Sequence, residues 1–519
     1  MDEIIIPVGE RPVTISEIVA IAANPATSVA LSRQGAFVDK IAKGSARLEE
    51  LWRKDQVIYG VTTGVGDSCV RRIPAELVPE LSLQLSRFHG CGLGRHFDPE
   101  VTRAILLVRL VSLALGYSAV RPELLQALAA LINHKILPLI PEEGSVGASG
   151  DLTPLSYVAA TLMGQGEVWQ AGKICPAADA LRAVGLQPLS LGPKEGLAIM
   201  NGTSVMTALA CLAFDRADYL LRLTARLSAM VSMAIGGNKA HFDPRLFAWK
   251  PHPGQREVAG WIAEDVGHQA GYIHQAGARV QDTYAIRCSP HVIGVLADAL
   301  PWMRTQIETE INGCNDNPLV DPDQGDVLHG GNFYGGHIAF AMDCLKNAVA
   351  NLADLVDRQM ALLIDDQRNG GLPLNLSGAR TDRLPVNHGF KAVQIACSAW
   401  AAEALKLTMP ASVFSRSTES HNQDKVSMGT IAARDCLRVL ELTEQVVVAT
   451  LLAGTQALDL RCRQQRLSWD DLSPGLRSLH QEVRTHSPLV EDDRALEKEL
   501  RLMLELVRKK QFTCLWKSH

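Results

Sequence analysis

The sequence predicts a mainly α-helical fold in which long helices pack as a bundle. Leu and Ala dominate the composition, and aromatic residues make up only 5% of it, a balance that favours helices over a β-sandwich or barrel. Between Ile338 and Leu363, apolar residues recur every three or four positions, which is the period of one helix face. One helix cannot bury such a stripe alone, so several should lie side by side.

The predicted elements begin with a short β segment and continue as helices separated by Gly-rich loops. Alternating apolar residues from Ile4 to Ile15 predict a β-hairpin that turns at residues 9–12. From Ser16 onward the pattern is helical, and helices are expected at residues 205–234, 338–363, 390–407, 426–460 and 496–507. By residue number, we divide the chain into an N-terminal region (1–200), a central helix bundle (201–470) and a C-terminal helical tail (471–519).

Composition excludes several classes of function. The chain has 51 basic and 56 acidic side chains, a net charge of −5, with no long block of one sign, so we expect neither a nucleic-acid partner nor a membrane surface. The 11 cysteines are scattered without a CxxC pair, which favours buried, reduced thiols. No zinc-binding motif is present, so no metal site is expected. The start is acidic and lacks a long apolar run, and we expect a cytoplasmic protein.

Residues 144–155, GSVGASGDLTPL, form the most unusual loop of the sequence. Thr153 followed by Pro154 predicts the start of a helix, with Thr153 as its N-cap. The glycine spacing GxxGxxG differs from the GxGxxG of a dinucleotide-binding turn, and Ser149 does not lie in the GxSxG of a serine-hydrolase elbow. From spacing alone, an ordinary helix-entry loop stays open as an interpretation.

The segment GSVGASGDLTPLSYVA at residues 144–159 resembles the signature of the histidine, phenylalanine and tyrosine ammonia-lyases and the related aminomutases. Six further blocks resemble the same family in its order, at residues 59–66, 195–203, 281–290, 315–318, 330–333 and 421–424. One departure is His291, where the family has Gln. The resemblance implies a long-helix bundle of the fumarase and aspartase type, with a small mixed α/β N-terminal region that holds the loop.

In that family the Ala-Ser-Gly triplet cyclises and loses two waters, which gives a 4-methylideneimidazol-5-one group, MIO. The resemblance places this chemistry on Ala148, Ser149 and Gly150, so that the Gly150 nitrogen attacks the Ala148 carbonyl. Glycine permits that close approach of backbone atoms. Ser149 then loses its hydroxyl and becomes an electrophilic methylene, and Asp151 assists proton removal. No metal and no diffusible cofactor are implied.

Two tyrosines receive catalytic roles by resemblance. Tyr59 is the general base that removes the β-proton, and Tyr284 lies near the substrate amine and assists proton transfer. A free phenol titrates near pH 10, so a base of this kind needs a stabilised anion. The methylene derived from Ser149 addresses the poor leaving ability of the amine by covalent catalysis. A plain turn residue is the structural alternative for Tyr59.

Four further residues are expected to bind substrate. Arg287 is the candidate clamp for the substrate carboxylate, because a planar guanidinium can form two hydrogen bonds with it. Asn201 helps to hold the same carboxylate or the ring carbonyl, Gln281 supports the pocket, and Phe333 packs beside the electrophile. The structural alternatives are a helix-pairing ion for Arg287 and core packing for Phe333.

Two positions sort substrates in this family. The pair Phe88-His89 mixes the patterns of different lyases, and Gln423 stands where histidine lyases have Glu. Phe88 offers an apolar wall to an aryl ring, and His89 offers one hydrogen bond to a phenol. We therefore expect L-tyrosine, giving trans-p-coumarate and ammonia. Phenylalanine, histidine and a 2,3-aminomutase reaction stay open, and an inactive structural homologue is the remote alternative.

The resemblance also implies a homotetramer whose active sites are shared among three chains. Tyr59, Arg287 and Gln423 come from distant segments, which is consistent with a site that one chain does not complete. The expected partners are therefore a small aromatic amino acid and further copies of this chain.

Overall fold

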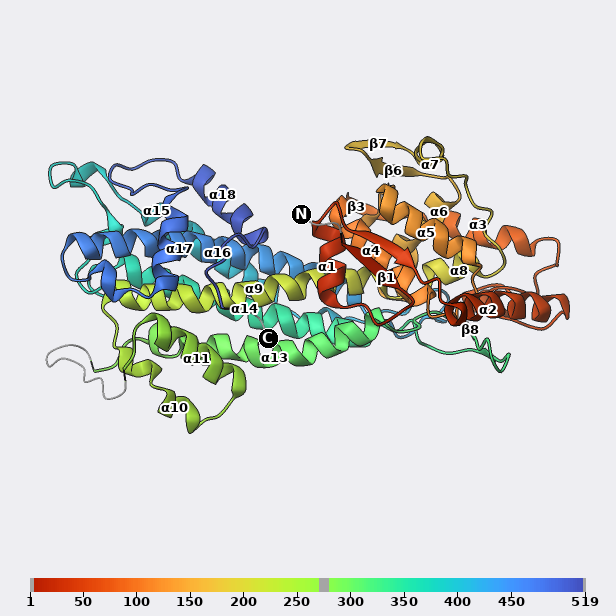
Figure 1. Cartoon of the computed structure of the whole chain (residues 1–519), viewed down its shortest axis with the longest axis horizontal. Helices are drawn as coiled ribbons and strands as arrows, with labels where there is room; N and C mark the ends of the chain where they lie inside the picture. The colour runs from red at the N-terminus through yellow and green to blue at the C-terminus, as the bar shows by residue number, and fades with distance from the viewer. Residues whose placement is uncertain (1–3, 270–279, 517–519) are drawn as a thin grey trace. The chain divides into compact units, whose positions relative to one another are not determined.

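The computed structural model describes residues 4–269 and 280–516, and it is mainly helical, as the sequence predicts (Figure 1). The chain divides into two compact units. Unit 1 comprises Met1–Asp215, Arg304–Asp343 and Pro410–Arg434, and unit 2 comprises Arg216–Met303, Cys344–Met409 and Asp435–His519. Residues 270–279 of the predicted central bundle and 517–519 of the predicted tail lie outside the described residues. The three-part division by residue number stays a prediction.

Long helices confirm the predicted bundle. They are α9 (Ser204–Ile235), α14 (Gly336–Ile364) and α16 (Gly429–Arg463), which match predicted helices, and α13 (Ser289–Ile311), which the sequence analysis did not predict. In unit 2, the Gln359 amide on α14 donates to Ser228 Oγ on α9 at 2.8 Å, and Thr443 Oγ1 on α16 donates to the Val349 carbonyl on α14 at 3.5 Å. Most of the apolar stripe of α14 is buried, including Ile338, Leu345 and Leu363 at 0% exposure. Burial of each such side chain contributes about 1.5–3 kcal/mol, so the stripe holds the helices together.

Shorter helices complete unit 2. They are α10 (Pro244–Ala248), α11 (Pro253–Asp265), α12 (Tyr284–Arg287), α15 (Lys391–Lys406), α17 (Pro474–Arg484) and α18 (Glu497–Arg508), with four short 3-10 helices at Lys239–Phe242, Leu374–Leu376, Leu384–Val386 and Trp469–Asp471. Two of them, α15 and α18, confirm the helices predicted at residues 390–407 and 496–507.

Unit 1 is a mixed α/β region. Its helices are α1 (Ile15–Ala23), α2 (Gly35–Arg53), α3 (Val78–His89), α4 (Pro99–Leu113), α5 (Pro122–His134), α6 (Leu152–Leu162), α7 (Ala177–Ala183) and α8 (Glu195–Met200), with 3-10 turns at Gly66–Val70 and Ala411–Val413. Helix α1 packs against α4, and α6 packs against α3 and α8. Because residues 102–113 of α4 are all buried, this helix forms the centre of the unit.

Small sheets surround these helices. The strands are β1 (Ile5–Val8), β2 (Ser28–Leu31), β3 (Leu93–His96), β4 (Leu137–Pro138), β5 (Pro141–Glu143), β6 (Glu167–Gln170), β7 (Lys173–Pro176), β8 (Leu319–Val320) and β9 (Val327–Leu328). Strand β3 pairs with β5, β4-β6-β7 form one sheet, and β8 pairs with β9, all antiparallel. The β3–β5 pair ends at Glu143, just before the loop that begins at Gly144.

The predicted N-terminal hairpin is wrong. Strand β1 pairs in parallel with β2, which follows helix α1 in the chain. The second half of the predicted hairpin is the start of α1, because Thr14 and Glu17 form a capping box. Such a reciprocal pair of hydrogen bonds satisfies two backbone N–H groups at a helix start. The alternation of Val13 and Ile15 therefore reflects a helix entry that buries both side chains.

The helix after the glycine-rich loop begins two residues earlier than predicted. Helix α6 starts at Leu152, with Asp151 at the N-cap position, so Thr153 is not the N-cap. Pro154 occupies the third helical position, which is tolerated because first-turn N–H groups have no partner inside the helix. The loop is thus shorter, and Asp151 lies at its end.

Across residues 4–269 and 280–516, no helix combines the length and apolar composition that crossing a membrane requires.

Candidate active site

The Ala148-Ser149-Gly150 segment forms a tight turn before α6. Ser149 and Gly150 have φ angles of +50° and +78°, a region that costs free energy for a residue with a side chain and little for glycine. A Cβ on Gly150 would collide with the Gly202 carbonyl. The third residue of the triplet therefore has to be glycine, which the predicted cyclisation also requires.

Two backbone hydrogen bonds hold the triplet against the connection between α8 and α9. Gly202 N–H donates to the Ser149 carbonyl at 3.2 Å, and Asp151 N–H donates to the Gly202 carbonyl at 2.8 Å. Gly150 and Gly202 thus face each other as a parallel β-bridge. The conformation of the turn depends on a segment about 50 residues further along the chain.

Asp151 is a fully buried carboxylate with four donors. The backbone N–H groups of Val205 and Met206 donate to it at 3.0 Å each, Ser145 Oγ donates at 3.2 Å, and Thr430 Oγ1 also donates. Burial raises the pKa of Asp151 to about 6, although the four hydrogen bonds act in the opposite direction. An acid that titrates near neutral pH can take up and release protons, which suits the predicted role in proton removal.

A cavity of about 610 Å³ opens beside the triplet in unit 1. The predicted site residues that line it are Tyr59, Phe88, His89, Ala148, Ser149, Asn201, Phe333 and Gln423. Gly150 and Asp151 are buried and complete the loop. Segments from six parts of the sequence therefore meet at one cavity, where a concave site with a few polar groups can hold a small molecule.

The Tyr59 hydroxyl accepts a hydrogen bond from Gly66 N–H at 2.7 Å. Burial raises the pKa of Tyr59, the Gly66 donor lowers it, and the charge of Glu419 raises it further. The phenol is therefore protonated at neutral pH in this conformation. Gly66 N–H is the group that can stabilise the anion when a proton is lost.

Phe88 and His89 end helix α3. Their ring centroids are 4.3 Å apart, and His89 Nδ1 lies 3.0 Å from the Leu85 carbonyl oxygen. A carbonyl oxygen only accepts, so Nδ1 carries the proton. Burial lowers the pKa of His89, and the neutral ring keeps Nε2 as a hydrogen-bond acceptor.

Gln423 lies in a short β-bridged turn with Thr418. Thr418 Oγ1 donates to Gln423 Oε1 at 2.8 Å, which leaves the Gln423 NH₂ group as a donor. In the same turn, Glu419 lines the cavity and accepts hydrogen bonds from Asp67 N–H at 2.7 Å and from the Asn422 amide at 2.9 Å.

Sequence reasoning missed Glu419. It approaches the segment that carries Tyr59, since a Cβ on Gly66 would collide with its carboxylate. The available signal was an acidic residue four positions before Gln423, two positions ahead of the block at residues 421–424.

Asn201 is 2% exposed and follows the last turn of α8. Its amide nitrogen donates to the Asn317 carbonyl at 2.9 Å, whereas its Oδ1 has no hydrogen-bond partner among the described residues. A buried acceptor without a partner is costly. In a residue that lines the cavity, it is suited to a donor on a bound molecule.

Gln281, Tyr284 and Arg287 are not among the residues that line this cavity. All three belong to unit 2. Tyr284 is 70% exposed, and the Arg287 guanidinium lies 4.5 Å from the centre of its ring. The Arg287 Nε group donates to the Asp282 carbonyl at 3.1 Å. Their predicted roles therefore stay predictions.

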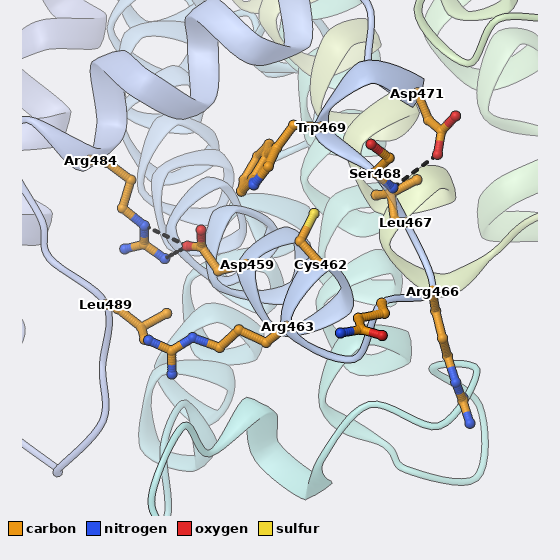
Figure 2. Close-up of a pocket in the computed structure, with 11 residues that line it drawn as sticks. Asp459, Cys462, Arg463, Arg466, Leu467, Ser468, Trp469, Asp471, Arg484 and Leu489 are labelled. Atoms are coloured by element: carbon orange, nitrogen blue, oxygen red, sulfur yellow. Dashed lines mark hydrogen bonds and ion pairs between the residues drawn. The ribbon is translucent and has the colours of Figure 1, made fainter.

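Figure 2 shows a larger cavity of about 850 Å³ in unit 2. Arg484 and Asp459 form an ion pair at 2.6 Å in its wall, and Asp459 is also bonded by His480 at 2.9 Å. Burial raises the pKa of the Cys462 thiol to about 11, which makes it a poor nucleophile. The residues that line this cavity all lie outside the predicted site. The cavity beside the triplet is thus the better candidate for the active site.

Residues 13–485 match the family model of aromatic amino acid lyases. The chain belongs to this family. Among its relatives, the histidine ammonia-lyase of Gloeobacter violaceus is 38% identical over 496 residues, which cover 95% of this chain and 94% of that protein. The histidine ammonia-lyase of Bacillus subtilis is 36% identical over 472 residues, which cover 91% of each protein.

Solved structures of aromatic amino acid lyase relatives have the same fold. The tyrosine aminomutase from Streptomyces globisporus is 32% identical, with a TM-score of 0.89 over 98% of both chains. The histidine ammonia-lyase from Trypanosoma cruzi is 29% identical, with a TM-score of 0.88 over 98% of this chain and 94% of that one. The predicted helical fold of the fumarase and aspartase type is confirmed, and the protein is a carbon–nitrogen lyase of this family. The histidine ammonia-lyases among its relatives favour the histidine alternative over tyrosine.

Proposed function

We propose that this aromatic amino acid lyase eliminates ammonia from an aromatic L-amino acid, with L-histidine as the first candidate substrate, after cyclisation of Ala148-Ser149-Gly150. The observation that carries the proposal is the turn at these three residues, held by Gly202 and ending at the buried Asp151, at the wall of a cavity. The cyclised group supplies an electrophilic carbon that improves the amine as a leaving group.

The residues of the cavity supply the other requirements of the elimination. Tyr59 removes the β-proton, and Gly66 N–H stabilises its anion at 2.7 Å. Burial raises the pKa of Tyr59, so the phenol is protonated at neutral pH. The fraction of the phenolate, which is the active base, therefore increases as the pH rises. Asn201 Oδ1, which lacks a partner among the described residues, accepts a hydrogen bond from the substrate amine.

Two side chains that line the cavity, those of His89 and Gln423, favour an imidazole ring as the side chain of the substrate. His89 Nε2 is an acceptor and the Gln423 NH₂ group is a donor. A neutral imidazole has one N–H donor and one nitrogen acceptor, so these two groups can satisfy both of its nitrogens. The histidine ammonia-lyases at 36–38% identity support the same choice.

Tyrosine is the second candidate. A phenol can donate to His89 Nε2, and Phe88 beside it supplies an apolar contact for the ring. Gln423 in place of a carboxylate also removes the charge that would hold a cationic imidazole. The likeness to a tyrosine aminomutase adds β-tyrosine as a product to look for.

We further propose that the active site is completed in a homotetramer. Gln281, Tyr284 and Arg287 lie in unit 2 and do not line the cavity of unit 1. In a shared site, Arg287 binds the substrate carboxylate through two hydrogen bonds, Tyr284 lies near the amine, and Gln281 supports the pocket.

The test offers L-histidine, L-tyrosine and L-phenylalanine in turn to the purified protein. Ammonia is measured together with the absorbance of each unsaturated acid, and β-amino acids are sought by chromatography. Ser149→Ala is the control, because it lacks the hydroxyl that cyclisation must lose. We expect ammonia and the unsaturated acid from histidine, and neither from the control.

Turnover of tyrosine without turnover of histidine would reverse the substrate choice and leave the reaction type standing. Loss of ammonia from no aromatic amino acid, by protein that retains the mass of the uncyclised chain, would refute the proposed function.

A further inference from the structure

Arg109 is the less exposed of the two arginines of helix α4, and no carboxylate among the described residues is its direct partner. It is 0% exposed. Its Nη1 donates to the Asn201 carbonyl at 3.2 Å, its Nη2 donates to Ser112 Oγ at 3.1 Å, and its Nε has no partner among the described residues. Burial of a cation with only neutral partners costs free energy. A role for Arg109 in function would explain why a cation is kept at this position.

The guanidinium lies directly against the backbone that holds the triplet. A Cβ on Gly202 would collide with Arg109 Nη1. Gly202 donates to the Ser149 carbonyl at 3.2 Å and accepts from Asp151 N–H at 2.8 Å. Arg109 is therefore linked, through the Asn201-Gly202 backbone, to the two residues that flank Gly150, Ser149 and Asp151.

Arg109 also brings a positive charge under the loop. Burial, the largest effect, lowers its pKa to about 10, and the charges of Asp316 and Asp151 act in the opposite direction, so it stays a cation at neutral pH. Asp316 itself pairs with the buried Lys194. The buried cations Arg109 and Lys194 thus accompany the buried acids Asp151 and Asp316. The positive charge of Arg109 favours the ionised form of Asp151.

We propose that Arg109 is a positioning residue for the cyclisation of Ala148-Ser149-Gly150, in which its buried guanidinium fixes the Asn201-Gly202 backbone against which the triplet turns. The inference rests on the proposed function, because it concerns how the electrophile forms. In this reaction the Gly150 nitrogen bonds to the Ala148 carbonyl carbon. The first water forms from that carbonyl oxygen and the amide protons of Gly150 and Ser149. The second water forms from the Ser149 hydroxyl and the Ser149 Cα proton. No oxidant or reductant is required.

Helix α4 carries a matched control. Arg103 is 4% exposed and donates to two backbone carbonyls, those of Asn24 at 3.1 Å and Thr27 at 2.7 Å. Burial lowers its pKa too. The two arginines therefore share a helix, deep burial, two hydrogen bonds to neutral acceptors and an Nε without a partner among the described residues. Of the two, Arg109 bonds the segment that holds the triplet.

The experiment compares Arg109→Met and Arg103→Met with the full-length native chain. Each is made by cell-free translation, translation is stopped, and intact mass is recorded over time to follow the loss of two waters. Circular dichroism and thermal unfolding report folding. Misplacement of reacting groups by about 1 Å costs on the order of a hundredfold in rate. We therefore expect Arg109→Met to lose water at least about tenfold more slowly than Arg103→Met.

Equal half-times for the two Met variants would overturn the proposal. If Arg109→Met does not fold, Arg109→Lys and Arg103→Lys are compared instead, because lysine keeps the charge but not the planar pair of donors. A slower loss of water in Arg109→Lys supports the proposal, and equal half-times refute it. A native chain that never loses water would instead refute the proposed function.

Discussion

Helix α14 and the loop at residues 144–151 obtain their conformations in different ways. In α14, a repeating apolar pattern buries residues such as Leu345 and Leu352 completely, and each neighbour along the chain supports the same helix. In the loop, the backbone of Gly150 is held by its β-bridge to Gly202. The buried carboxylate of Asp151 is satisfied by N–H groups at the start of α9.

The contrast separates stability from chemistry. A substitution in the bundle removes one of many similar contacts, so it should lower the free energy of unfolding and leave the reaction intact. A substitution in the loop removes a backbone approach that nothing else replaces, so it should stop the chemistry and change stability less. Four experiments can break or sharpen this contrast.

The largest effect is expected for Gly150→Ala. A methyl group there would collide with the Gly202 carbonyl, so the turn cannot form, and we expect ammonia release to fall by at least about a thousandfold. Intact mass should show that both waters are retained. The control is Gly172→Ala, which has a similar φ of +81° but no atom within 4 Å of the added carbon; it should lose both waters normally.

Tyr59→Phe should give the next largest effect. The loss of a general base costs about 10²–10⁴-fold in kcat, while cyclisation should proceed, because Tyr59 does not bond the triplet. The native activity should rise with pH as the phenol ionises, since burial raises its pKa. Steady-state ammonia release and intact mass are the measurements. A variant with native kcat would show that another group removes the proton.

In the bundle, Leu352→Ala should lower the free energy of unfolding by about 2–5 kcal/mol and leave water loss and kcat unchanged at low temperature. Leu352 is 0% exposed. The neighbouring exposed Asn351 provides the control, and Asn351→Ala should change stability by less than about 0.5 kcal/mol. Thermal unfolding measures both. If Leu352→Ala stopped cyclisation in folded protein, the contrast between the two regions would fail.

The smallest effect concerns the pH dependence of stability. The pKa of Asp151 is raised from 3.8 to about 6 by burial, so its contribution to stability is fully present below about pH 4 and is lost as the pH rises through about 6. Asp151→Asn stays neutral. Its thermal stability relative to the native chain should therefore increase between pH 4 and pH 7, by at most about 3 kcal/mol, although it should lose water slowly. A difference that does not change with pH would show that Asp151 titrates normally.

The sequence predicts the bundle well because its signal is local. The period of three or four residues across residues 338–363 is enough to predict α14. The N-terminal hairpin failed because the partner of β1 is β2, which lies beyond α1, and because the capping box of Thr14 and Glu17 went unnoticed.

Most of the predicted residues that line the cavity lie in blocks matched to the family, and Phe88 and His89 were found as a position that sorts substrates. Arg109 and Glu419 were not found, because they act through contacts that folding creates. On the proposed homotetramer, the roles of Gln281, Tyr284 and Arg287 depend on how chains assemble, which neither periodicity nor the fold of one chain determines.

The donors to Asp151 link the order of folding to the appearance of reactivity. Because two of them are the first-turn amides of α9, the acid is in place only after that helix has started, more than 50 residues later in synthesis. On the proposed function, a nascent or misfolded chain carries an ordinary tripeptide. The reactive carbon arises only inside a folded protein, where the cavity controls which amines reach it.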